Sequence, residues 1–191
     1  FDTISWLHLE KSLRRCLGGN RCSAHKLQFR LLPTTLNHRH KKGGERALDR
    51  RCPRCTTFHH EDFEHVFRCV TPSAVATRQS SFSALTTALT KRNVDTYLSQ
   101  AIITGIQSWL DDTVAIWPHA VPHPADHYAT LVHDAFYSQD DIGWSNMLRG
   151  RISKLWLSAY DLRCESLSMD RQTYRSHILG PILVEQLWTF S

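Results

Sequence analysis

Hydrophobic residues recur every three or four positions along most of the chain, which is the spacing of one face of an α-helix. The alternation of apolar and polar residues that predicts strands is nearly absent. The pattern predicts a first helix over residues 3–17, ended by the GGN at 18–20, and a second from Ser23 to about His40, which Pro33 kinks or splits. We therefore expect a mainly α fold.

Two further helices are predicted after residue 70. Pro72 suits a first helical turn and opens a helix of about 18 residues over 73–90. Asn93 or Asp95 caps the next helix, over 95–112. Its expected buried stripe consists of Tyr97, Leu98, Ile102, Ile106, Trp109 and Leu110.

The rest of the chain is predicted to be helical after a proline-rich loop at 113–125. A short helix follows over 126–137, then a long helix over 144–163, and a last one over 170–190 that Gly180-Pro181 bends. Apolar residues at helical spacing mark the long helix, namely Met147, Leu148, Ile152, Leu155, Trp156 and Tyr160.

The most specific motif is a Cys-x2-Cys-x9-His-x3-Cys arrangement within 18 residues. Cys52 and Cys55 are spaced to bind one ion from a tight turn, which could form a short β-hairpin, and on a helix His65 and Cys69 would share one face. Three thiols and one imidazole are the four ligands of a structural zinc site, and they leave no position for a catalytic water. A buried thiol cluster or a disulfide is the alternative, and His59 or His60 could replace His65.

Composition agrees with a folded, intracellular protein. The chain has 191 residues, 41% of them hydrophobic, and no run of about 18 apolar residues that would cross a membrane. Its start lacks a signal-peptide pattern and an initiator Met, so we expect a fragment of a longer protein. Cys16, Cys22 and Cys164 remain beside the motif, and this odd number of thiols suits a reducing compartment.

The charge is distributed unevenly. Residues 1–55 contain 13 Lys and Arg against 4 Asp and Glu, a net of +9, whereas residues 56–191 have a net of −4. A basic segment beside a zinc site is typical of contact with a phosphate backbone. A solvated basic face without a partner is the alternative.

No catalytic site is expected. The histidines between His119 and His133 lie in or beside the proline-rich segment and are expected on a surface loop. Asp140-Asp141 are expected to precede a helix and to suit its N-terminal dipole. A nuclease or polymerase remnant would need three or more acids in one cleft, which we do not expect. The chain has no phosphate-binding glycine loop and no nucleophile elbow, and Trp109, Trp144, Trp156 and Trp188 are expected to fill the core.

The motif and its flanks resemble the zinc-binding segment that follows the polymerase domain of LINE-like (non-LTR) retrotransposon reverse transcriptases. The residues that carry this resemblance are Leu32-Pro33-Thr34, Cys52-Pro53-Arg54-Cys55, Glu61, His65 and Cys69. Ile142-Gly143-Trp144, Gly150-Arg151-Ile152-Ser153 and Trp156 are more loosely similar to the stretch that follows it.

The resemblance implies a non-catalytic accessory domain of an RNA-directed DNA polymerase, which holds template RNA or target DNA beside the rest of that polyprotein, and it implies a nuclear location. One Zn²⁺ would be bound by Cys52, Cys55, His65 and Cys69. The residues expected to meet phosphates are Arg14, Arg15, Lys26, Arg30, Arg39, Lys41, Lys42, Arg50, Arg51 and Arg54.

Three segments are expected: a basic helical segment over 1–48, a zinc knuckle over 49–72, and a helical region over 73–191 that could pack as one domain with the rest. A structural or protein-interaction zinc module, without nucleic-acid contact, is the alternative function.

Overall fold

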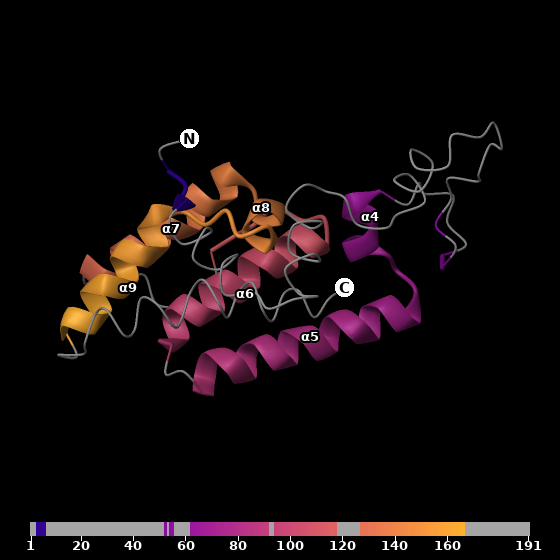
Figure 1. Ribbon diagram of the computed structural model, residues 1–191, viewed down its shortest axis with the longest axis horizontal. Coiled ribbons are helices and arrows are strands. Elements are labelled where there is room, and N and C mark those ends of the chain that lie inside the picture. The colour runs from indigo at the N-terminus through magenta and orange to yellow at the C-terminus, as the bar shows by residue number, and fades with distance from the viewer. Residues whose placement is uncertain are drawn as a thin grey trace.

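The computed structural model describes residues 3–6, 52, 54–55, 62–91, 94–117 and 127–166 (Figure 1). This part of the chain is mostly helical and has no strand, which confirms the expected mainly α fold. Its helices in order are α4 (Phe63–Arg68), α5 (Pro72–Lys91), α6 (Thr96–Leu110), α7 (His127–Ile142), α8 (Trp144–Leu148) and α9 (Lys154–Ser166).

Helices α5 and α6 begin where the sequence predicts. Pro72 is the first residue of α5. The Asp95 carboxylate caps α6 by accepting hydrogen bonds from the backbone N–H groups of Tyr97 and Leu98, at 3.0 and 3.4 Å. The predicted stripe of α6 is buried except for Tyr97 and Trp109, which are half-buried and pack against the core.

Helix α6 passes through the middle of the packed helices, with α5 along one side and α7 and α8 on the other (Figure 1). Gly105 allows α6 to lie close to α8, because a Cβ atom at position 105 would overlap the indole ring of Trp144 on α8. Trp144 and Trp156 are buried, as expected for core residues. Trp188 lies outside the described residues.

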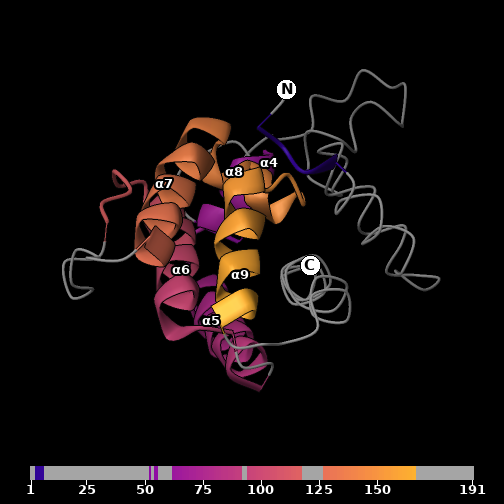
Figure 2. The ribbon, with the colours of Figure 1, turned by 90° about the vertical axis from the view of Figure 1, so that its left-hand side faces the viewer.

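The prediction of one long helix over 144–163 is wrong, because this segment forms two helices, α8 and α9, with a break between them. Gly150 adopts a left-handed conformation with φ 78°, which ends α8. The fully buried side chain of Gln139, on α7, bonds to the backbone of the break: its Nε2 donates to Arg151 O at 3.2 Å, and its Oε1 accepts from Ser153 N at 2.9 Å. Helix α9 then packs along α7 (Figure 2).

Helix α7 continues to Ile142, five residues beyond the predicted end at 137. Asp140 and Asp141 therefore precede a helix as expected, but that helix is the short α8 and the two residues themselves lie in the last turn of α7. Asp140 accepts a hydrogen bond from Trp144 Nε1 at 2.9 Å, so this carboxylate fixes the turn between α7 and α8.

The start of the chain is attached to the break between α8 and α9. Ile4 and Ser153 form an isolated antiparallel bridge. Ser5 N donates to Ile152 O at 2.9 Å, and Lys154 N donates to Thr3 O at 2.8 Å. Residues 3–5 therefore pair with the break and are not helical, contrary to the predicted start of the first helix at residue 3, whereas Trp6 has helical conformation.

Several expectations fall outside the described residues: the helix over 3–17 beyond residue 6, the helices over 23–40 and 170–190, and most of the segment over 1–48. The boundaries of the three segments stay predictions. Residues 113–117 have no regular structure, as predicted for the loop at 113–125. Within the described ranges, no helix combines the length and apolar character needed to cross a membrane.

Candidate metal centre

The four residues of the Cys-x2-Cys-x9-His-x3-Cys motif converge. The sulfur atoms of Cys52, Cys55 and Cys69 and a ring nitrogen of His65 all lie within 4.8 Å of one another. His65 Nε2 is 3.3 Å from Cys55 Sγ. A tetrahedral zinc site needs sulfur–sulfur separations of about 3.8 Å, so the group is close enough to hold one metal ion.

The capping of α4 orients His65. The Asp62 carboxylate accepts a hydrogen bond from the backbone N–H of His65 at 2.7 Å and thereby caps the first turn. Phe63 and Phe67 are buried on the same short helix, with ring centroids 5.2 Å apart. Cys69 is the C-cap residue of α4 and has left the helical conformation, so its sulfur reaches the group from just beyond the helix.

Arg78, on α5, holds the backbone at the end of α4. One guanidinium nitrogen, Nη1, donates to Phe67 O at 2.9 Å and to Cys69 O at 2.6 Å. Both acceptors belong to a helix end, where carbonyl groups have no intrahelical partner. Arg78 therefore positions the ligand Cys69 from a different helix. No local sequence signal marked it.

A second set of contacts joins α4 to the C-terminal end of α6. The rings of Phe67 and Trp109 are 6.0 Å apart, and the Arg68 guanidinium lies 4.9 Å from the centre of the Trp109 ring. Arg68 also forms an ion pair of 2.8 Å with Asp112. Asp112 occupies a left-handed position with φ 55°, directly after the end of α6.

The site is partly shielded from solvent. Cys52 and Cys69 are buried, with 5% and 1% of their surfaces exposed, whereas Cys55 and His65 are half-buried. Burial raises the pKa of Cys52, although backbone hydrogen bonds from Arg54 and Cys55 oppose that rise. Burial also disfavours the thiolate of Cys69, but hydrogen bonds from Thr71 and the neighbouring thiols outweigh it and lower the pKa of Cys69.

This geometry narrows the alternatives that the sequence leaves open: it excludes a disulfide among the described cysteines, whereas a metal site and a buried thiol cluster both agree with it. Cys52, Cys55 and Cys69 are free thiols, so no disulfide joins them. His65 belongs to the group, while His59 and His60 lie outside the described residues. The described residues of the Cys-x2-Cys turn show no β-hairpin.

His127 and His133 lie on α7 and are not part of this site, so the expectation of a surface loop is wrong for these two residues. The ring of His133 packs against Trp117 and Tyr137. His119 and His123 fall outside the described residues. Within the described part of the chain, the Cys/His group is the one cluster of three or more His, Cys, Asp or Glu side chains placed to share an ion.

Of the residues expected to meet phosphates, the structure describes Arg54. Its side chain is exposed, next to Cys55. The others lie outside the described residues: Arg14, Arg15, Lys26, Arg30, Arg39, Lys41, Lys42, Arg50 and Arg51.

Comparison with known proteins gives no match: no protein-family model fits the chain, and no curated protein and no solved structure is significantly similar to it.

Proposed function

We propose that this chain is a zinc-stabilised accessory module that binds nucleic acid and is not itself catalytic. The convergence of Cys52, Cys55, His65 and Cys69 carries the proposal. Three thiolates and an imidazole favour zinc over magnesium or calcium, which prefer oxygen ligands. Because the protein fills all four tetrahedral positions, the ion would stabilise the fold without activating a water molecule.

The basic N-terminal part supports the nucleic-acid contact. Residues 1–55 have a net charge of +9 and end at the Cys-x2-Cys turn. Arg54 is exposed between two of the ligands, where a phosphate can approach it. Together with the resemblance of the motif to the segment behind retrotransposon reverse transcriptases, this favours template RNA or target DNA as the partner, the remainder of a reverse transcriptase as the neighbouring chain, and the nucleus as the location.

A specific observation favours the alternative of a structural or protein-interaction module. Two basic residues beside the site are occupied by internal contacts: Arg78 bonds to the carbonyl groups of Phe67 and Cys69, and Arg68 to Asp112. They are poorly placed to contact phosphates as well.

A salt titration of the zinc-loaded chain tests the proposal. The affinity for a short duplex or single strand is measured against salt concentration, and each phosphate contact contributes roughly −0.7 to −0.9 to the slope of log affinity against log salt. Arg54→Ala should reduce the magnitude of the slope by about one. Lys91→Ala is the matched control, because Lys91 is exposed at the opposite end of α5 from the site.

Zinc content is measured on the same preparation. One zinc per chain with a steep slope agrees with the proposal. An affinity that does not change with salt, or no binding at low salt, would favour the structural or protein-interaction module. A zinc content well below one per chain would contradict the metal assignment.

A further inference from the structure

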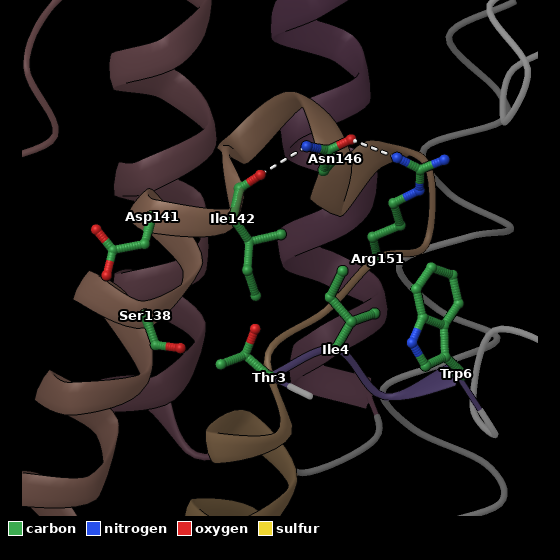
Figure 3. Close-up of a pocket in the computed structure, with 8 residues that line it drawn as sticks. All are labelled: Thr3, Ile4, Trp6, Ser138, Asp141, Ile142, Asn146 and Arg151. Atoms are coloured by element: carbon green, nitrogen blue, oxygen red, sulfur yellow. Dashed lines mark hydrogen bonds between the residues drawn. The ribbon is translucent and has the colours of Figure 1, made fainter. Parts of the chain in front are cut away.

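A pocket of about 360 Å³ lies between the start of the chain and the turn that joins α7 to α8 (Figure 3). Ile4 and Ile142 provide apolar walls, and Trp6, Asn146 and Arg151 surround its other end. The pocket shares no residue with the metal centre. Its volume is within the range of about 300 to 1,000 Å³ that is typical of small-ligand sites.

Trp6 provides an exposed aromatic surface. It keeps 42% of its surface exposed, although the neighbouring Ser5 is buried and the backbone on both sides of Ile4 is fixed by hydrogen bonds to the break between α8 and α9. The backbone is therefore held while the ring faces solvent beside the pocket. An exposed, positioned indole is the kind of platform on which nucleic-acid bases stack.

Arg151 places unused hydrogen-bond donors at the same end of the pocket. Its Nη1 donates to Asn146 Oδ1 at 3.3 Å, which orients the guanidinium. Within the described part of the chain the other guanidinium N–H groups have no partner, and Nε is buried without one. Asp141 also lines the pocket, on the side opposite Arg151 in Figure 3. The pocket therefore suits a flat ligand that carries hydrogen-bond acceptors.

We propose that this pocket takes one unstacked base of a single-stranded nucleic acid, which stacks on Trp6 and accepts hydrogen bonds from Arg151. The proposal rests on the proposed function and adds to it a preference for single strands. Trp6 belongs to the basic part of the sequence, residues 1–55, which has a net charge of +9. A paired base inside a duplex cannot enter.

The experiment compares a fluorescein-labelled 12-nucleotide single strand with the duplex of the same sequence, on the full zinc-loaded chain. The wild type should bind the single strand more tightly. Trp6→Ala should weaken single-strand binding about 10-fold, because one base stack is lost, and should leave duplex affinity unchanged. Trp6→Phe keeps an aromatic ring and should recover most of the loss.

Tyr137→Ala is the matched control. Tyr137 is an aromatic residue with the same exposure, 43% against 42% for Trp6, but it does not line the pocket. Its replacement should change neither affinity. Arg151→Gln removes the guanidinium charge and its donors, and should weaken single-strand binding alone. The midpoint of urea unfolding for each variant shows whether the fold is retained.

The outcomes separate this proposal from the proposed function. If the wild type binds neither nucleic acid, the proposed function fails. If it binds strand and duplex equally and Trp6→Ala has no effect, the pocket proposal fails while phosphate binding stands. A free nucleoside monophosphate offers the same base, so displacement of the strand by an equal concentration of the monophosphate would assign the pocket to a free nucleotide and overturn the proposal.

Discussion

Arg78→Met tests how the metal centre is held. The Arg78 guanidinium donates to Phe67 O at 2.9 Å and to Cys69 O at 2.6 Å, which are carbonyl groups at the end of α4. Methionine keeps most of the apolar stem of the side chain but removes both donors. The substitution therefore changes the support of the ligand Cys69 without changing any of the four ligands.

The magnitude follows from the type of hydrogen bond. A hydrogen bond to a charged group contributes about 1.5 to 3 kcal/mol, and about 1.4 kcal/mol corresponds to a factor of ten in an equilibrium constant. If the bond to Cys69 is made only when this residue is in its ligating position, its loss should lower zinc affinity by about 10- to 100-fold. Residues that support metal ligands commonly have effects of about this size.

The assay is competition for zinc with a chromophoric chelator. Gln79→Ala is the control, because Gln79 is the exposed neighbour of Arg78 on α5. Arg78→Lys keeps a positive charge but lacks the planar guanidinium, so its zinc affinity should fall between those of Arg78→Met and Gln79→Ala. If Arg78→Met binds zinc within about twofold of Gln79→Ala, the argument that Arg78 positions Cys69 is refuted.

Three further changes have outcomes that the contacts define. Gly105→Ala should destabilise the fold by about 1 to 3 kcal/mol, because the new methyl group overlaps Trp144, and an unchanged urea midpoint would contradict this packing. Asp95→Ala should cost at least about 1 kcal/mol in thermal unfolding, because it removes the α6 cap and also the acceptor for Tyr128 Oη at 2.9 Å, whereas Asp95→Asn should keep most of the cap. Acidification should release the zinc, measured with a metal indicator, because protonated thiols and imidazolium do not ligate. In metal-free protein, raising the pH should lower the stability of the fold, because folding raises the pKa of Cys52. The contribution of Cys52 to stability is complete below the ordinary thiol pKa and is lost as the pH rises through the raised value. Urea unfolding at a series of alkaline pH values measures this loss.

Features that depend on neighbouring residues could be predicted from the sequence. Pro72 and Asp95 mark the starts of α5 and α6 because the conformation of proline and the hydrogen bonds of a capping carboxylate act within one turn. The spacing of Cys52, Cys55, His65 and Cys69 likewise identified residues that do converge, because each pair is close in sequence; Cys69, however, lies just beyond α4 and does not share a helical face with His65.

Features that depend on distant residues could not be predicted. The apolar spacing continues through Gly150, so the sequence resembles one helix from Trp144 to Arg163. The break exists because Gln139, on another helix, supplies hydrogen bonds to Arg151 and Ser153 that the helix would otherwise supply itself. Arg78 was missed for the same reason, since its role appears only when α5 lies beside the end of α4.

The contacts divide the described basic residues at the metal centre into two groups with different roles. Arg68 bonds to Asp112, just after α6, and Arg78 bonds to the end of α4, so both residues connect α4 to neighbouring helices. Arg54 is exposed on the Cys-x2-Cys turn, whose two sulfur atoms belong to the ligand group. A bound ion would fix that turn against a body that is already held together by Arg68 and Arg78, and would thereby set the direction in which Arg54 faces. Under the proposed function, the ion would therefore orient Arg54 toward a phosphate although none of the four candidate ligands contacts the nucleic acid.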